Sequence, residues 1–102
     1  MTFEVIFTAE VDRDLEAISD VRTRKAIIRK AFDLDTEPDK QGKPLSGDLA
    51  AYRVVRAAGQ RYRVVYQVAT LEGVVTVVVV GIRKEGDKRD VYRVAGKRLG
   101  KQ

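Results

Sequence analysis

The sequence predicts an α+β domain in which a small, antiparallel-rich, four-stranded sheet packs against an N-terminal helical hairpin and carries a C-terminal helix. A chain of 102 residues can bury one core, so residues 1–102 are expected to form a single domain. Apolar residues recur at helical spacing in the first third of the chain, whereas over 52–80 they alternate or run continuously, as in strands. The expected order is strand, helix, helix, three antiparallel strands, helix.

Residues 3–7 predict a short strand because their apolar side chains alternate. Thr8 is a preferred helix N-cap, and the helix that it opens has an apolar stripe made by Val11, Leu15 and Ile18. Asp20 can cap a second helix over 21–35. The outward face of that helix carries Arg22, Lys25, Arg29 and Lys30. The two helices are therefore expected to form a hairpin.

The stretch 37–48 contains breakers and no periodicity, which predicts a loop. Three strands are expected to follow, over 52–56, 61–68 and 74–80. The third holds six valines and has no polar face, which indicates a central strand covered on both sides. A final helix over 90–99 is expected to turn Val91, Ala95 and Leu99 inward and Arg93, Lys97 and Arg98 outward, before a tail that frays.

The composition excludes several kinds of site. The chain has no cysteine and no histidine, so it has no disulfide, no thiolate metal site and no histidine base. We therefore expect neither a metal nor a cofactor. The longest uncharged apolar stretch, 73–82, is half of the ~20 residues that cross a bilayer, and the N-terminus has no basic and apolar leader. A cytoplasmic protein with no membrane partner is expected.

Charge is divided unequally along the chain. The net charge is +5, but residues 1–51 hold eight Lys and Arg against eleven Asp and Glu, whereas residues 52–102 hold twelve against four. Clustered cations favour a polyanionic partner such as nucleic acid, because phosphates gain charge pairing and release counterions. A surface charge that only keeps the protein in solution is the alternative, and charge alone leaves both open.

The cations of the second half gather at a few places in the predicted sheet. They are Arg53 and Arg56 on one strand, Arg61 and Arg63 on the next, and Arg83 and Lys84 after the third, with Tyr92 following. Adjacent strands lie about 4.8 Å apart, so arginines that share a face can surround one phosphate. Strict alternation puts Arg53 and Arg56 on opposite faces unless a bulge re-aims one of them. The alternative is that the cations are solvated and that Tyr92 pins the last helix to the core, but the absence of carboxylates from 52–68 favours a binding site.

Other catalytic sites are poorly supported. The stretch 42–47 lacks the order of a phosphate-binding loop and the helix that follows one, so it indicates a structural connection. Ser19 and Ser46 have no histidine to act as a base. The paired carboxylates lie near predicted helix ends, where capping explains them, and the basic half holds too few for a two-metal nuclease.

Several segments together carry a resemblance to a known family. They are residues 42–49, 52–53, 59–68, 80–84, 90–92 and 95–99. The Tyr-Arg-Val-Val-Tyr run at 62–66 and the Val-Gly-Ile-Arg-Lys run at 80–84 are the most specific, whereas the N-terminal helices match only in pattern. These segments resemble the RelE/ParE superfamily of bacterial type II toxins, and the RelE branch most closely.

The resemblance implies a ribosome-dependent endoribonuclease that enters the decoding site beside the 16S rRNA, cuts mRNA and is held inactive by a cognate antitoxin. Matched position by position, the residues around the scissile phosphate are Arg63, Arg83, Tyr92 and Arg53. The neighbouring cations Arg56, Arg61 and Lys84 are expected to bind RNA phosphates.

The reaction that the resemblance implies is attack of a ribose 2′-OH on the adjacent phosphate, giving a 2′,3′-cyclic phosphate and a free 5′-OH without a metal. Arg63 and Arg83 are expected to stabilise the developing anion, and Tyr92 to take the 2′-OH proton or to stack on a base. Lys84, or Arg53 through a water, is the expected proton donor to the leaving group.

Two departures from the family pattern bear on this site. Val55 stands where RelE-like enzymes often carry a second lysine, and residues 86–90 make a longer segment before Tyr92. Two other functions therefore stay open: a ParE-like inhibitor of DNA gyrase on the same fold, and an inactive nucleic-acid-binding relative.

Overall fold

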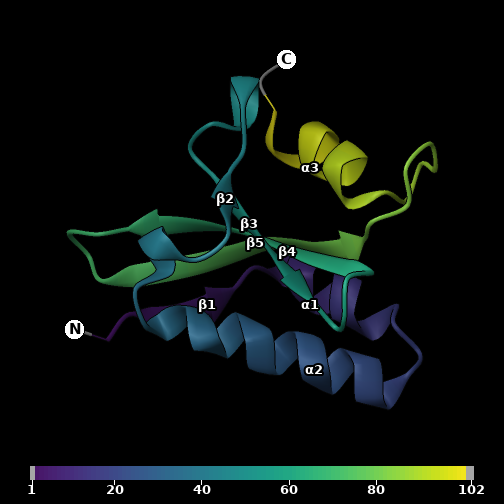
Figure 1. Cartoon of the computed structure of the whole chain (residues 1–102), viewed down its shortest axis with the longest axis horizontal. Helices are drawn as coiled ribbons and strands as arrows, with labels where there is room; N and C mark the ends of the chain where they lie inside the picture. The colour runs from purple at the N-terminus through teal and green to yellow at the C-terminus, as the bar shows by residue number, and fades with distance from the viewer. Residues whose placement is uncertain (1, 101–102) are drawn as a thin grey trace.

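The computed structural model describes residues 2–100 and confirms the α+β class. A twisted sheet lies between a pair of helices on one face and a single helix on the other (Figure 1). The elements are β1 (Glu4–Phe7), α1 (Ala9–Glu16), α2 (Val21–Phe32), β2 (Lys43–Pro44), β3 (Arg53–Ala57), β4 (Tyr62–Ala69), β5 (Val74–Ile82) and α3 (Val91–Leu99). Of the tail that is expected to fray, residues 101–102 lie outside the described residues.

The sheet has five strands in the order β1-β5-β4-β3-β2, not the four expected. β1 runs parallel to β5, and the other pairs are antiparallel. The additional strand, β2, lies inside the stretch predicted as a loop and pairs Lys43 with Val54 and Pro44 with Arg53. Two residues are too few to show a period, and Pro44 is tolerated because β2 is an edge strand.

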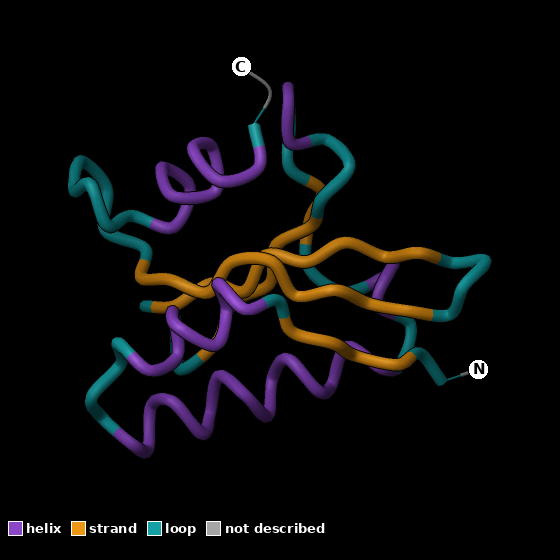
Figure 2. Tube along the Cα trace, turned by 180° about the vertical axis from the view of Figure 1, so that it is seen from behind, coloured by secondary structure: helices purple, strands orange, loops and turns teal. Residues whose placement is uncertain are grey.

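The two N-terminal helices begin at the predicted caps and pack beneath the sheet (Figure 2). The Thr8 hydroxyl accepts a hydrogen bond from Val11 N, and the Asp20 carboxylate accepts from Arg22 N. α2 ends at Phe32, three residues before the predicted end, and a 3₁₀ turn over Asp33–Asp35 takes its place. Such tightening is common where an α-helix ends.

Two apolar clusters lie on the two faces of the sheet. The larger joins α1 and α2 to the sheet through residues such as Val11, Ile27 and Tyr66. The smaller joins α3 to the other face through residues such as Val79 and Val91. The valine strand β5 contributes to both clusters, which confirms that it is covered on both sides.

Arg98 does not point outward from α3 as predicted. Its guanidinium pairs with Asp14 of α1, with Nη1 2.8 Å from Oδ2, and Nη1 also donates to Val78 O. Asp14 accepts a hydrogen bond from Val80 N. Since β1 reaches only as far as Val77 along β5, this ion pair satisfies backbone groups at the free edge of β5 and ties α3 to α1.

Within residues 2–100, no helix has both the length and the apolar character needed to cross a membrane.

Candidate functional site

The side chains of β3 alternate without interruption, because its register with β4 is regular from Arg53 to Ala57. Val54 belongs to the cluster that packs against α3, whereas Val55 belongs to the cluster on the side of α1 and α2. Arg56 therefore lies on the α3 face with Val54, and Arg53 lies on the opposite face. No bulge brings the two arginines together.

Arg56 lies directly across from Arg63 in the pairing of β3 and β4. The two side chains share the face of the sheet that α3 covers only in part. Like charges opposite each other on neighbouring strands are destabilising, and residues 52–68 contain no carboxylate that could offset them. An arginine pair of this kind is suited to an anion held between the two guanidinium groups.

A cleft of about 350 Å³ opens at this arginine pair. Its lining residues are Lys30, Gly42, Lys43, Val54, Val55, Arg56, Arg63 and Tyr92. Four of these eight are cationic and none is acidic, so the cleft has a positive potential. It bends around the edge of β3, because β2 pairs only with Arg53 and Val54 and leaves the rest of that edge open.

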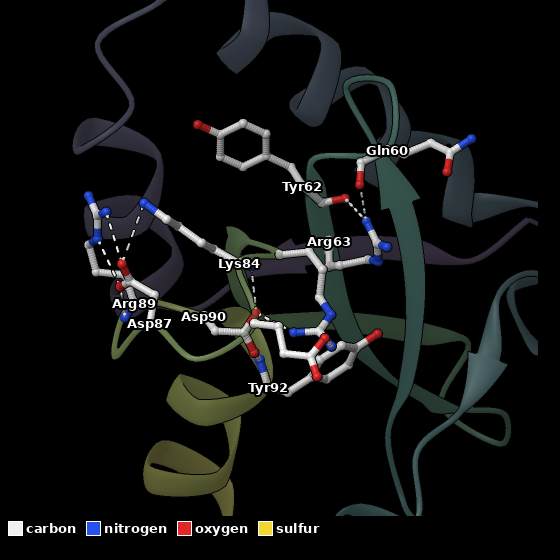
Figure 3. Close-up of polar contacts among 10 residues, drawn as sticks. Gln60, Tyr62, Arg63, Lys84, Asp87, Arg89, Asp90 and Tyr92 are labelled. Carbon is white, nitrogen blue, oxygen red and sulfur yellow. Dashed lines mark hydrogen bonds and ion pairs between the residues drawn. The ribbon is translucent and has the colours of Figure 1, made fainter.

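Arg63 is turned toward the β3–β4 turn (Figure 3). Its Nη1 lies 2.5 Å from Gln60 O and 3.2 Å from Tyr62 O. The same turn carries Arg61, whose side chain is exposed and whose carbonyl accepts a hydrogen bond from Arg83 N. Arg61 therefore lies beside the site and does not line the cleft.

Arg83 lies over the ring of Tyr92, with its guanidinium carbon 4.9 Å from the ring centroid. Its Nη1 also donates to Asp90 Oδ1 at 2.6 Å, and this hydrogen bond raises the pKa of the guanidinium. The stack and the ion pair hold Arg83 and Tyr92 together at the start of α3. Arg83 thus borders the cleft through Tyr92.

Asp90 is buried, with 6% of its surface exposed, and it binds the residues around the start of α3 to one another. It accepts hydrogen bonds from Lys84 N at 2.6 Å and from Tyr92 N at 3.2 Å, the second of which caps α3 (Figure 3). Burial raises the pKa of Asp90, but the hydrogen bonds from Arg83, Lys84 N and Tyr92 N outweigh it and leave the pKa below its ordinary value. Asp90 is therefore a carboxylate at neutral pH.

Lys84 and Arg89 lie in the connection between β5 and α3, and both pair with Asp87. Lys84 Nζ is 3.6 Å from Asp87 Oδ2, and Arg89 Nε is 3.2 Å from Asp87 Oδ1. The hydrogen bonds from Arg89 hold the pKa of Asp87 far below its usual range. The Lys84 side chain does not line the cleft.

Arg53 holds the chain before β2 instead of lining the cleft. Its Nε and Nη2 donate to Gln41 O at 3.1 and 3.0 Å, and Nη2 also donates to Gly42 O. The hydroxyl of the buried Tyr66 lies 2.8 Å from the carbonyl oxygens of both Pro38 and Gln41. Burial raises the pKa of Tyr66, which keeps its hydroxyl a donor.

The structure thus brings Arg56, Arg63 and Tyr92 together, with Arg83 stacked behind the tyrosine. Arg53, Arg61 and Lys84 lie outside this group. Two cationic residues of the cleft are not among the site residues expected from the sequence: Lys43, in the segment predicted as a loop, and Lys30, expected on the solvated face of α2. A two-residue strand and the unpaired edge of β3 are long-range features that no local pattern shows.

The arrangement can bind and stabilise a phosphate and can place a tyrosine hydroxyl beside it. Within residues 2–100 there is no group of three or more acidic side chains that could hold a metal ion.

Residues 5–87 match the sequence profile of the ParE toxin family of type II toxin-antitoxin systems. Among solved structures, the chain is 32% identical to a chain of the toxin-antitoxin complex RelBE2 from Mycobacterium tuberculosis, covering 81% of this chain and 93% of that one with a TM-score of 0.74.

Two further solved structures share the fold. A mutant of the Escherichia coli toxin RelE in the free state is 23% identical, with 97% of this chain and 99% of that chain covered and a TM-score of 0.74. A chain of the chromosomal ParDE system from P. aeruginosa is 12% identical, with 78% and 94% covered and a TM-score of 0.65. No curated protein sequence is significantly similar to the chain.

Proposed function

Because the chain belongs to the RelE/ParE superfamily of type II toxins, we propose that it is a ribosome-dependent endoribonuclease that cuts mRNA and inhibits translation. A cognate antitoxin is the partner that holds it inactive, as the RelBE2 complex from M. tuberculosis pairs a similar chain with an antitoxin. The mRNA in the decoding site, next to the 16S rRNA, is the proposed substrate.

The observation that carries this proposal is the arginine pair in an acid-free cleft. Arg56 on β3 and Arg63 on β4 lie directly opposite each other on adjacent strands, and Tyr92 borders the same cleft. Opposed like charges oppose folding, so this arrangement supports a role in holding an anion. A phosphate between the two guanidinium groups would convert their repulsion into two attractive contacts.

In the proposed reaction, the ribose 2′-OH attacks the adjacent phosphorus and the bond to the 5′-oxygen breaks. The products are a 2′,3′-cyclic phosphate and a free 5′-OH. Arg63, Arg56 and Arg83 stabilise the charge that grows on the phosphorane oxygens, and Tyr92 as its phenolate takes the 2′-OH proton. A guanidinium keeps its proton at any physiological pH, so the arginines act by electrostatics alone.

The Nη1 group of Arg83 is not free to bind the phosphate, because it already donates a hydrogen bond to Asp90. The stacking on Tyr92 keeps the guanidinium at the border of the cleft, and the donors on its other nitrogens are the ones proposed to reach the phosphate. Arg53 is proposed to support the β2 segment and to take no part in the chemistry.

The test is addition of the purified protein to a translating bacterial extract, followed by mapping of RNA ends. We expect cuts in phase with the codons of translated mRNA, with cyclic phosphate and 5′-OH ends. Tyr92→Phe keeps the ring under Arg83 and removes the hydroxyl, so it should bind ribosomes and cut at least about 10²-fold more slowly. An mRNA that stays intact in the presence of folded wild-type protein would contradict the proposal.

A ParE-like inhibitor of DNA gyrase is the second candidate, and the match to the ParE family profile is the observation that favours it. The same protein incubated with gyrase and supercoiled DNA separates the two. Accumulation of gyrase-dependent DNA breaks with intact mRNA would support this candidate. If neither DNA breaks nor mRNA cuts appear, the result supports an inactive nucleic-acid-binding relative.

A further inference from the structure

The cleft needs a proton donor for the leaving 5′-oxygen, and the residues expected in that role lie elsewhere. Lys84 is outside the cleft lining and its ammonium is paired with Asp87. Arg53 is on the opposite face of the sheet, bound to backbone carbonyls. The cleft arginines hold their protons too tightly to give them up.

Two lysines are among the residues that line the cleft, Lys43 and Lys30. Lys43 pairs with Val54 in the sheet, and Val54 packs against α3, so Lys43 lies on the face that carries Arg56 and Arg63. A second hollow next to the cleft is lined by both Lys43 and Tyr92. Lys30, in contrast, comes from α2 on the other face and reaches the cleft around the free edge of β3.

The backbone that carries Lys43 is held from several sides. Arg53 donates to Gln41 O and Gly42 O, and the Tyr66 hydroxyl contacts Gln41 O as well. Gly42 lies so close to β3 that a Cβ there would be 2.1 Å from Val54 O. A catalytic group on a fixed strand keeps its position while the side chain alone moves.

We propose that Lys43 is the general acid of the cleavage reaction, which rests on the endoribonuclease function proposed above. As the P–O5′ bond breaks, the Lys43 ammonium gives a proton to the 5′-oxygen, and the 2′-OH proton passes to the phenolate of Tyr92. The products are a cyclic phosphate, a 5′-OH, a neutral amine and a neutral phenol. Proton return from the phenol to the amine through water completes the cycle.

On this assignment Arg53 and Tyr66 are positioning residues, because they act on the reaction only through the backbone that presents Lys43. On this proposal, Lys43 on β2 takes the place of the lysine that RelE-like enzymes often carry on β3, where this chain has Val55.

The experiment measures single-turnover cleavage on programmed ribosomes with two mRNAs, one normal and one with sulfur in place of the 5′-oxygen at the scissile linkage. A thiolate leaves without being protonated, so it bypasses a general acid. Lys43→Arg keeps the charge and cannot donate the proton. We expect it to cut the oxygen substrate about 10² to 10⁴-fold more slowly than wild type and the sulfur substrate at nearly the wild-type rate.

Two lysine-to-arginine controls accompany this variant. Lys40→Arg changes an exposed lysine that pairs with Glu37, and it should cut both substrates like wild type. Lys30→Arg changes the other ammonium of the cleft, and any loss of rate should be equal on both substrates. A thermal melt of each variant verifies that it folds.

Each other outcome overturns the proposal in a different way. A Lys43→Arg protein with wild-type rate on oxygen shows that the lysine is not the acid, while the endoribonuclease function stands. Equal losses on oxygen and sulfur show that Lys43 only places the RNA. Rescue by sulfur in Lys30→Arg instead assigns the acid to Lys30. Wild-type protein that cuts neither substrate removes the proposed function and this inference with it.

Discussion

Arg56 illustrates how a residue that we propose to bind phosphate can oppose stability. It faces Arg63 directly, and it is exposed. We expect Arg56→Ala to leave the free energy of unfolding unchanged or to raise it by up to about 1 kcal/mol, because the repulsion between opposed like charges is removed. Urea unfolding measures this, and toxicity on induction should be lost in the same variant. A loss of stability greater than about 1 kcal/mol would show that Arg56 is a structural residue.

Asp90 makes the stability of the corner around Tyr92 dependent on pH. Its pKa in the folded protein lies below the value of about 3.9 in the unfolded chain, so its contribution is fully present above that value and is lost as the pH falls through the folded pKa. Asp90→Asn keeps a side-chain oxygen for the helix cap and loses the charge that binds Arg83.

We therefore expect Asp90→Asn to be less stable than wild type by about 1 kcal/mol or more at pH 7, and the difference to shrink as the pH is lowered below about 4. Urea unfolding of both proteins across this range measures the difference, in which Asp87 and the other carboxylates cancel. A difference that stays constant down to pH 2 would mean that the charge of Asp90 contributes nothing.

The strand β2 is an element that depends on one glycine. Gly42 has φ +61° and no room for a Cβ, whereas Gly59 has φ +73° and open space around it. We expect Gly59→Ala to cost about 1 to 2 kcal/mol from backbone strain alone, and Gly42→Ala to cost at least about 2 kcal/mol more from the clash with Val54 O. Thermal or urea unfolding compares the two. Equal losses would show that the segment before β2 moves away from β3 without penalty.

The ion pair of Arg98 and Asp14 joins α3 to α1, and both side chains also form hydrogen bonds with the backbone of β5. Arg98 donates to Val78 O and Asp14 accepts from Val80 N, while the two side chains bind each other. Arg98→Ala or Asp14→Ala should each lower the free energy of unfolding by about 1 to 3 kcal/mol.

The swapped variant Asp14→Arg with Arg98→Asp should be at least as unstable as either single variant, because a guanidinium cannot accept from Val80 N and a carboxylate cannot donate to Val78 O. Urea unfolding of the four proteins in parallel gives the comparison. Full recovery of stability in the swap would mean that only the mutual attraction of the charges matters.

At the scale of the whole molecule, the excess of cations in the second half of the sequence contributes to a positively charged cleft on the sheet. The net charge of +5 arises from the C-terminal half, and the cations of the cleft add Lys30 and Lys43 from the N-terminal half. An antitoxin that masks this surface should be acidic where it covers the cleft.

We expect the affinity of the toxin for its antitoxin to fall as salt is raised from about 0.1 M to about 0.5 M, because the charges across the interface are screened. Titration calorimetry at several salt concentrations measures it, with Arg56→Ala as the variant that should show a weaker dependence. An affinity that does not change with salt would indicate an apolar interface away from the cleft.

The elements that depend on local information could be predicted from the sequence alone. Thr8 and Asp20 cap their helices as predicted, since a cap is decided within a few residues. The strands β3, β4 and β5 follow from alternation and from the valine run. Arg63 and Tyr92 were identified as site candidates, and they do line one cleft.

The side chains that meet in the folded chain could not be predicted in the same way. The tertiary structure separated Arg53 from Arg56, turned Arg98 inward to Asp14, and added β2 with Lys43 to the cleft. Each of these depends on contacts between residues far apart in the chain, such as the 84 positions between Arg98 and Asp14. Local periodicity reports which face of an element is apolar, whereas the strand pairings and helix packing that place two faces side by side are made only when the chain folds.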